Sequence, residues 1–208
     1  MLFRDRDDAA RRLAEALAQY RGQNPLVLAI PRGAVPMAKI IAEELSGEVD
    51  VVLVRKLRAP GNPEFAIGAV DETGWVYLAE HGRHVAGSQE YIDSEKAAQM
   101  EVMRERRASY TPVRPPHDPA ERIVIVVDDG LATGSTMIAA LHALRARQPQ
   151  KLVCAVPVAP PDTLDKVSPY ADEIVCLSAP ELFYAVGQFY QSFPQVSDEE
   201  VIAALAGD

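Results

Sequence analysis

The chain has 208 residues, of which 48% are hydrophobic, and its formal net charge at pH 7 is −9. This length and hydrophobic fraction indicate one α/β domain with a packed core over residues 1–208. The acidic balance argues against a nucleic-acid-binding groove, which carries a basic face, so local groups must hold any anionic ligand.

The cysteines and the hydropathy pattern bear on the cellular compartment. Cys154 and Cys176 both lie in apolar runs, and two cysteines are too few for a disulfide framework. We expect both to be buried small hydrophobic residues. The sequence contains no run of 18 apolar residues. We therefore expect a cytoplasmic protein with neither a membrane nor a nucleic acid as its partner.

The first part of the chain alternates amphipathic and apolar runs. Leu13, Ala14 and Leu17 share one face with charges opposite, which predicts a helix over residues 7–20. The following strands are apolar throughout, as parallel strands buried on both faces are. The pattern predicts a strand at 26–30, a helix at 35–45 and a strand at 49–54.

Residues 55–87 interrupt this alternation. Prolines and glycines punctuate the segment, and only 66–70 and 75–78 have the pattern of short strands. A long insertion of this kind within a compact domain is usually functional or mobile, so we predict an irregular, flexible loop. A charged helix at 89–109 follows, and a proline-rich linker at 111–119 ends it.

The second half of the chain resumes a strand–helix rhythm. Residues 180–208 form an aromatic-rich tail, in which Ser197 begins a helix with a capping signature. Strands that alternate with helices predict a doubly wound, mostly parallel α/β sheet, whose ligands bind beyond the carboxyl ends of the strands. The predicted strands lie at 122–127, 151–156 and 173–177, and the predicted helices at 135–147 and 162–167.

A run of nine residues, 128–136, directly follows an apolar strand. Asp128 and Asp129, at the carboxyl end of a buried strand, can accept hydrogen bonds from vicinal hydroxyls or hold a hydrated Mg²⁺. Residues 133–136 present backbone N–H groups and three hydroxyls at a helix N-terminus, which is a cradle for a phosphate monoester. This strand–loop–helix unit predicts binding of a ribose 5-phosphate, which carries both a diol and a phosphate.

Each piece of this run also has a purely structural interpretation. Asp-Asp-Gly alone is a common solvated turn, and Thr-Gly-Ser-Thr alone can simply cap a helix. Their occurrence together, in order after an apolar strand, favours the functional interpretation. The run is not a Walker A loop, because it lacks Gly-Lys-Ser/Thr.

Residues 124–136, Val-Ile-Val-Val-Asp-Asp-Gly-Leu-Ala-Thr-Gly-Ser-Thr, resemble the 5-phosphoribosyl-1-pyrophosphate signature of type I phosphoribosyltransferases. The resemblance implies that fold, with a flexible loop at 55–87 and a small hood from the terminal segments, chiefly 180–208. It also implies that Asp128 and Asp129 hold the ribose hydroxyls, directly or as ligands of Mg²⁺. The rest of the donor-binding loop would be Gly130, Leu131, Ala132, Thr133, Gly134, Ser135 and Thr136.

Pro31-Arg32-Gly33 comes just after the first strand, where this family has its pyrophosphate loop. The resemblance places a non-proline cis peptide between Pro31 and Arg32. Arg32 supplies a fork of donors for an oxyanion, and Gly33 permits close approach of the backbone. The alternative is an ordinary turn with a surface arginine.

Arg55, Lys56 and Arg58 end the second predicted strand. Similar cations in the family contact the leaving pyrophosphate, and the loop beyond them closes over it to exclude water. The resemblance therefore assigns Arg55 and Lys56 to catalysis, together with Asp128 and Asp129, and Arg58 to donor binding. The alternative is a set of surface ion pairs with nearby acidic residues.

The tail at 182–193 is similar to the segment with which 6-oxopurine phosphoribosyltransferases hold the acceptor base. On that match Phe183 would stack on the base and Val186 would line its pocket. Ala132, however, stands where hypoxanthine-type enzymes carry an aspartate, whereas adenine- and uracil-type members share its Ala-Thr-Gly sequence. The tail and the loop therefore favour different acceptors, and both remain open.

These features predict a phosphoribosyltransferase of nucleotide metabolism. It would transfer ribose 5-phosphate from 5-phosphoribosyl-1-pyrophosphate to a purine- or pyrimidine-like base, with Mg²⁺ as cofactor, and release pyrophosphate. The alternative is a regulatory protein that senses the donor or a nucleotide without transferring it. The family resemblance further implies a homodimer.

Overall fold

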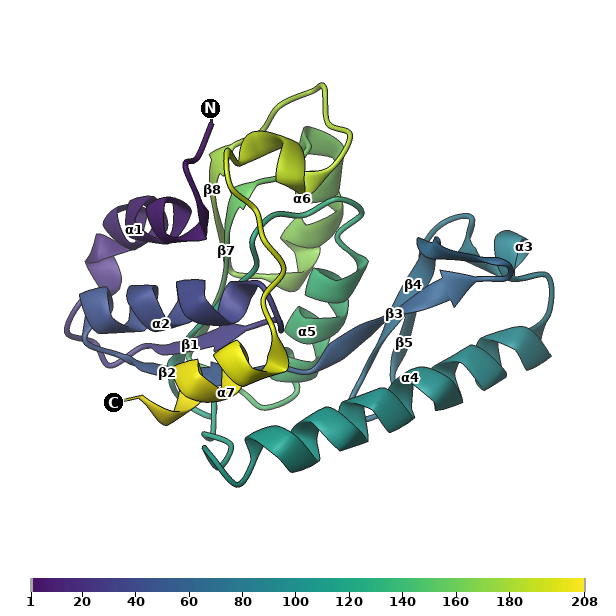
Figure 1. Ribbon diagram of the computed structural model, residues 1–208, viewed down its shortest axis with the longest axis horizontal. Helices are drawn as coiled ribbons and strands as arrows, with labels where there is room; N and C mark the ends of the chain where they lie inside the picture. The colour runs from purple at the N-terminus through teal and green to yellow at the C-terminus, as the bar shows by residue number, and fades with distance from the viewer. Residues whose placement is uncertain (1, 208) are drawn as a thin grey trace.

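The computed structural model describes residues 2–207. Its centre is a five-stranded sheet in the order β2-β1-β6-β7-β8, with every neighbouring pair parallel (Figure 1). This arrangement confirms the predicted doubly wound α/β fold. The strands of the sheet are β1 (Leu26–Ala29), β2 (Glu48–Val51), β6 (Ile123–Val127), β7 (Lys151–Val158) and β8 (Glu173–Ser178).

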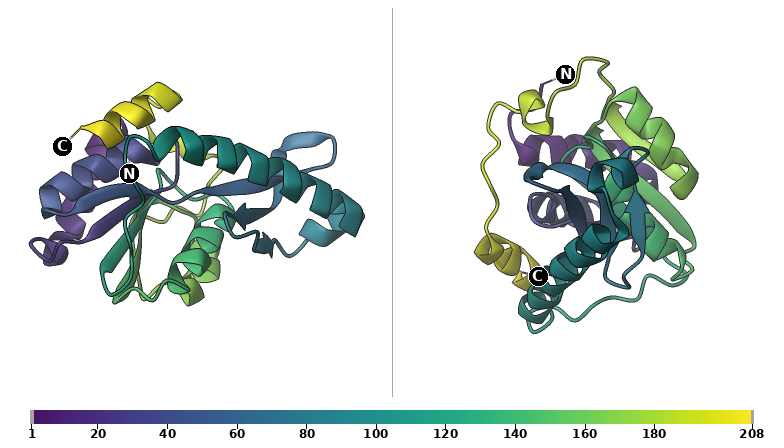
Figure 2. Two further views of the ribbon diagram at one scale, coloured as in Figure 1. Left: turned by 90° about the horizontal axis from the view of Figure 1, so that it is seen from below. Right: turned by 90° about the vertical axis from the view of Figure 1, so that its right-hand side faces the viewer.

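Helices cover both faces of this sheet (Figure 2), because its strands carry apolar side chains on both sides. Val27 and Ala29 point into one core cluster, which α1 and α2 complete. Leu26 and Leu28 point into the other, which α5 and α6 complete. These helices are α1 (Arg6–Ala16), α2 (Ala34–Leu45), α5 (Ser135–Arg145) and α6 (Pro161–Val167).

The winding direction of the sheet reverses between β1 and β6. From β1 the chain passes through α2 to β2 at one edge, whereas from β6 it passes through α5 and α6 toward β8 at the other. β1 and β6 are direct neighbours, with Ala29 in register with Val127. The carboxyl ends of these two strands therefore flank the crevice in which doubly wound folds bind ligands.

Residues 54–110 form an ordered extension where an irregular loop was predicted at 55–87 (Figure 1). The difference arises at Pro60 and Gly61, which form the two-residue turn of an antiparallel hairpin, with Gly61 at φ +68°. Whether this hairpin moves during function stays a prediction. The extension comprises the antiparallel strands β3 (Val54–Ala59), β4 (Asn62–Asp71) and β5 (Val76–Leu78) and the helices α3 (Gly82–Ala86) and α4 (Gln89–Tyr110).

Two predicted elements end earlier than expected. β2 ends at Val51 because Val54 already begins β3 of the extension. The first helix ends at Ala16 and is followed by a short 3-10 turn, η1 (Ala18–Tyr20). A second 3-10 turn, η2 (Ser168–Tyr170), follows α6. The remaining helices and strands of the central sheet lie within a few residues of their predicted positions.

The two terminal segments lie together and form the hood, defined here as residues 2–4 and 180–207. The backbone N–H of Phe3 donates to the Phe189 carbonyl at 2.8 Å, and the N–H of Gln191 donates to the Phe3 carbonyl at 2.8 Å. Ser197 caps the last helix with the predicted capping box. The hood contains the 3-10 turn η3 (Val186–Phe189) and the helix α7 (Asp198–Ala206), which packs against α2.

The cysteines lie on neighbouring strands of the sheet and form no disulfide. Cys154 on β7 is buried and Cys176 on β8 is half-buried, in keeping with their prediction as small hydrophobic residues. Within residues 2–207, none of the helices combines the length and the apolar character that crossing a membrane requires.

An aromatic stack attaches the extension to the central domain. Trp75, in the turn between β4 and β5, lies flat on His142 of α5, with ring centroids 3.6 Å apart and planes at 8°. Phe65 and His81, near the free end of the extension, make a looser contact at 5.4 Å and 48°. The Trp75–His142 stack therefore anchors the base of the extension.

We expect the Trp75–His142 stack to contribute measurably to stability. In a double-mutant cycle of Trp75→Ala and His142→Ala, the coupling free energy should be about 0.5–1.5 kcal/mol, as for other packed ring pairs. The same cycle on Phe65 and His81 is the matched control and should give a smaller coupling. Urea unfolding measures both, and equal couplings would contradict the anchoring role.

Candidate functional site

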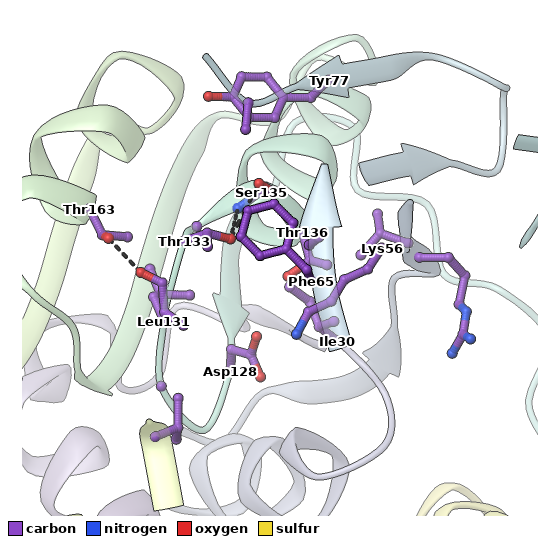
Figure 3. A pocket seen from close by; sticks show the side chains of 18 of the residues that line it. Ile30, Lys56, Phe65, Tyr77, Asp128, Leu131, Thr133, Ser135, Thr136 and Thr163 are labelled. Atoms are coloured by element: carbon purple, nitrogen blue, oxygen red, sulfur yellow. Dashed lines mark hydrogen bonds between the residues drawn. The ribbon is translucent and has the colours of Figure 1, made fainter. Parts of the chain in front are cut away.

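A cavity of about 1100 Å³ lies beyond the carboxyl ends of β1 and β6 (Figure 3). Its walls come from residues 30–33 after β1, from residues 128–136 after β6, from the extension including β3, from α6 and from the hood. The cavity thus gathers segments that lie far apart in the sequence. Of the predicted site residues, it brings together Arg32, Gly33, Arg55, Lys56, Arg58, Asp128, Asp129, Gly130, Leu131, Ala132, Thr133, Gly134, Ser135, Thr136 and Val186.

Two adjacent carboxylates occupy the end of β6 at the base of this cavity. Asp128 follows the fully buried Val127, and its Oδ1 accepts a hydrogen bond from the Asp129 N–H at 2.9 Å. Burial raises the pKa of Asp128 well above the usual carboxyl value, and the neighbouring Asp129 raises it further. Burial also raises the pKa of Asp129, although Arg6 opposes this shift. The charged form of both carboxyls is therefore unfavourable in the free protein, and a bound cation would stabilise it.

Residues 133–136 form a loop that opens α5 toward the cavity. Gly134 adopts the left-handed conformation at φ +81° and, as the N-cap residue of α5, has no side chain to cap the helix. The Ser135 N–H donates a long hydrogen bond of 3.5 Å to the Thr133 hydroxyl. The Thr163 hydroxyl donates to the Ala132 carbonyl at 2.6 Å and ties the loop to α6 (Figure 3). Figure 3 shows Thr133, Ser135 and Thr136 around the same hollow as Asp128. This arrangement suits an anion held by backbone amides and hydroxyls.

The loop after β1 closes the opposite side of the crevice. The peptide bond between Pro31 and Arg32 is cis, as the family resemblance predicts. Gly33 lies directly against the second acid, because a Cβ added there would come 2.5 Å from the Asp129 Oδ2 atom. Only glycine therefore lets the loop and the carboxylate meet at this point.

The three cations of β3 do not share one environment. Lys56 extends into the cavity toward Asp128 (Figure 3), and its charge partly opposes the rise in the pKa of that carboxyl. Arg55 and Arg58 also line the cavity, but their Nε–H groups donate to side chains of α4. Arg55 donates to Gln99 and Arg58 donates to Glu95, each at 2.9 Å. Burial lowers the pKa of Arg55, and the nearby Arg106, Arg58 and Arg32 lower it further. Of these three cations, Lys56 is thus the one that acts on the acid pair, whereas Arg55 and Arg58 are held by α4.

The α4 partners are Glu95 and Gln99, which sequence reasoning missed. Gln99 accepts from Arg55 and donates to Glu95 at 2.7 Å, while Glu95 accepts from Arg58. Burial alone would raise the pKa of Glu95, but the bonds from Arg58 and Gln99 outweigh it and the pKa is lowered. A sequence signal existed, since both polar residues fall on the apolar stripe between Ile92 and Met103.

The hood contributes two side chains to the cavity, but one of them differs from the prediction. Val186 lies against Gly130, since a Cβ on that glycine would come 2.6 Å from the valine Cγ1. Phe193, which was not predicted, lines the cavity with Val186. Phe183, which was predicted to stack on the base, instead packs on Phe189, with ring centroids 5.2 Å apart. It is not among the residues that line the cavity.

An open parallel sheet, with paired acids and an amide-lined loop at its switch point, defines the phosphoribosyltransferase class of fold and site. The family model of the phosphoribosyl transferase domain matches residues 4–192, so the chain belongs to this family. The crystal structure of TT1426 from Thermus thermophilus is 47% identical, with a TM-score of 0.82 over 99% of this chain and 98% of that chain.

Two curated relatives come from Mycobacterium tuberculosis, strains CDC 1551 / Oshkosh and H37Rv. Both are named provisionally as phosphoribosyl transferases, and each is 42% identical over 207 residues. The match covers 98% of this chain but 46% of each relative. This chain thus spans about half the length of these relatives.

We expect Gly134→Ala to destabilise the protein more than the matched Gly22→Ala. Both glycines have nearly the same positive φ, +81° and +79°, so each alanine costs about 1–2 kcal/mol of backbone strain. At Gly134 the new methyl group also meets Thr163 Cγ2 at 2.9 Å, whereas nothing lies within 4 Å at Gly22. Overpacking should add about 1–3 kcal/mol.

Chemical unfolding of both variants measures this difference. Thr163→Ser removes the Cγ2 atom and keeps the hydroxyl that bonds Ala132. It should therefore recover part of the loss in a Gly134→Ala background. Equal destabilisation at the two glycines would contradict the packing of the loop on α6.

We expect Asp128→Asn to stabilise the ligand-free protein at pH 8. Because the folded-state pKa of Asp128 is raised, the folded chain binds more protons than the unfolded chain between the usual carboxyl pKa and the raised value. The unmutated protein therefore loses stability as pH rises through that window, by about 1.4 kcal/mol for each pH unit crossed.

Asparagine cannot ionise, so the advantage of the variant should grow from pH 4 to pH 8. Unfolding curves recorded with a metal chelator at several pH values measure it. Asp165→Asn, at an exposed position on α6, is the control and should lack this trend. A variant that is less stable than the unmutated chain at pH 8 would show that the carboxylate is well solvated.

Proposed function

We propose that the chain transfers ribose 5-phosphate from 5-phosphoribosyl-1-pyrophosphate to a nitrogen of a purine- or pyrimidine-like base. One observation carries this proposal: the two acids, the amide-lined loop and the cationic segments all line one cavity at the switch point of the sheet. Membership of the phosphoribosyl transferase domain family supports the general activity. Donor, acceptor and metal are the parts that require experiment.

The donor matches the cavity group by group. Residues 133–136 offer backbone N–H groups and hydroxyls for the 5-phosphate. Asp128 and Asp129 lie beside that loop and accept hydrogen bonds from the ribose hydroxyls. Arg32, Gly33 and Lys56 line the side on which the pyrophosphate would leave.

The residues present also fit Mg²⁺. Asp128 and Asp129 offer carboxylate oxygens, and their raised pKa values indicate two charges that a cation would stabilise. Residues 2–207 contain no cluster of three or more His, Cys, Asp or Glu side chains that would complete a metal site. Water and donor oxygens would supply the other ligands, as Mg²⁺ prefers. A magnesium ion held by Asp128 and Asp129 would neutralise charge on the departing pyrophosphate.

In the transfer, the bond from C1 to the pyrophosphate oxygen breaks and a bond from C1 to the acceptor nitrogen forms. Pyrophosphate carries away the electron pair of the broken bond, and its oxygen takes up the proton that the acceptor nitrogen gives up. Lys56 and Arg32 stabilise the negative charge that develops on pyrophosphate. Phe65 and Tyr77 line the wall that the extension contributes and exclude water from C1 (Figure 3).

The acceptor would lie between residues 130–132 and the hood. Val186 and Phe193 line that part of the cavity, so they are the proposed contacts of the base. Phe183 would contact a base only after leaving Phe189. Ala132 offers no carboxylate to the ring nitrogen, so the proposed transfer relies on positioning and charge rather than on a protein base at this point.

The homodimer and the cytoplasmic location, both inferred from the sequence, stay predictions. Because the chain spans about half the length of its curated relatives, the activity of the whole protein is likewise proposed.

We expect the chain to bind 5-phosphoribosyl-1-pyrophosphate with Mg²⁺ and to lose this binding in Asp128→Asn/Asp129→Asn. Isothermal titration calorimetry measures both, because the variant removes the groups proposed to hold the diol and the metal. Glu43→Gln/Glu44→Gln removes two adjacent exposed acids on α2 and is the matched control. A lack of donor binding by the unmutated chain would refute the proposed function.

Pyrophosphate release then separates an enzyme from a sensor. The unmutated chain is incubated with donor, Mg²⁺ and a panel of purine and pyrimidine bases, and products are identified by mass spectrometry. Release that depends on one base supports transfer and names the acceptor. Donor binding without release for any base would favour the regulatory alternative.

A further inference from the structure

An arginine outside the predicted site contacts the second acid of the pair. Arg6 donates from Nε to the Asp129 Oδ2 atom at 3.2 Å, and its Nη2 atom lies 3.2 Å from the same oxygen. The side chains of Arg6 and Asp129 are 11% and 17% exposed, so water screens this ion pair only partly. One carboxylate oxygen of Asp129 is thereby occupied by the protein itself.

The same guanidinium binds the hood. Its Nη1 atom donates to the Pro194 carbonyl, and its Cζ atom lies 3.9 Å from the centroid of the Phe193 ring. Tyr190 of the hood also donates its hydroxyl to the backbone carbonyl of Asp129 at 2.6 Å. The hood therefore holds Asp129 through its backbone, and Arg6 holds it through its carboxylate.

The position of Arg6 in its helix has no local explanation. Arg6 is the first residue of α1, where a positive charge opposes the helix dipole. The residues that follow it, Asp7 and Asp8, have the charge that a helix N-terminus favours. The contact with Asp129 offsets this local disadvantage, which points to a role in the site.

Arg6 also lies against the loop that follows β1. A Cβ added to Gly33 would come 2.9 Å from the Arg6 Nη2 atom and 2.5 Å from the Asp129 Oδ2 atom. The guanidinium, the carboxylate and the glycine backbone therefore meet at one point. A shift of any one of them has to displace the other two.

We propose that Arg6 is a positioning residue, which holds the Asp129 carboxylate in the orientation needed to bind the ribosyl donor. By occupying the Oδ2 atom, it leaves the Oδ1 atom for the ribose or the metal. Its positive charge favours the ionised form of Asp129, which repels the neighbouring Asp128. Without Arg6, that repulsion turns the Asp129 side chain away from Asp128. This inference rests on the proposed donor binding and adds a residue that the family signature does not contain.

The test compares two arginines of the same helix. Arg12, like Arg6, pairs with an aspartate, at 3.0 Å from Asp8, and lies over an aromatic ring, at 5.3 Å from Phe3. Neither arginine is among the residues that line the cavity, but Arg6 contacts Asp129, whereas Arg12 pairs with Asp8. Calorimetry with donor and Mg²⁺ should show affinity weakened about 10- to 100-fold in Arg6→Met. Arg12→Met should bind as the unmutated chain does, and Arg6→Lys should recover part of the loss.

A second ligand separates positioning from a general loss of structure. Inorganic phosphate probes the loop at 133–136 alone, because it has no hydroxyls for Asp129 to hold. In thermal-shift titrations, Arg6→Met should respond to phosphate as the unmutated chain does. Equal loss of donor and phosphate binding, or equal loss in Arg12→Met, would overturn the positioning role.

The outcomes also distinguish this inference from the proposed function. If the unmutated chain fails to bind the donor, both fall together. If the unmutated chain and Arg6→Met bind the donor equally well, the inference on Arg6 is wrong and the proposed function stands.

Discussion

Asp128 and Asp129 place two carboxylates side by side where β6 leaves the sheet, and burial raises the pKa of each. Two ionised carboxylates in adjacent positions repel each other, and burial strengthens this repulsion. The fold offsets part of this cost with positive charge, because Lys56 opposes the rise in the pKa of Asp128 and Arg6 opposes that of Asp129. A chain whose net charge is −9 nevertheless concentrates cations around one cavity. The need to balance these two acids accounts for much of the architecture nearby.

Each balancing cation is held by a different part of the fold. Arg6, which pairs with Asp129, is fixed by the hood, and Lys56, which acts on Asp128, comes from β3. Arg55 and Arg58 line the same cavity and are held from behind by α4. The site is therefore complete only when the central sheet, the extension and the hood are all in place. The extension in turn depends on its stack against α5. Formation of the site is coupled in this way to the packing of regions distant from it.

Local patterns in the sequence were sufficient for the central sheet and the loop at 128–136. Apolar runs of strand length, separated by helical periodicity, specify a doubly wound sheet because burial on both faces leaves few alternatives. The acids and the glycine-containing loop follow β6 without a gap, so their proximity needs no long-range information. The extension was missed because Pro60 and Gly61 break regular structure by themselves and form a hairpin turn only when two long strands pair around them.

The missed partners of the site contact residues far away in sequence. The separation is 123 residues for Arg6 and Asp129, 37 for Arg58 and Glu95, and 31 for Thr163 and Ala132. The hydrophobic periodicity of a single helix or strand contains no information about contacts between residues this far apart in sequence. Two of these partners nonetheless break a local rule, since Arg6 places a cation at a helix N-terminus and Glu95 places a carboxylate on an apolar stripe. Folded proteins accept such conflicts where another contact offsets them, so the conflict itself marks a residue whose partner lies elsewhere.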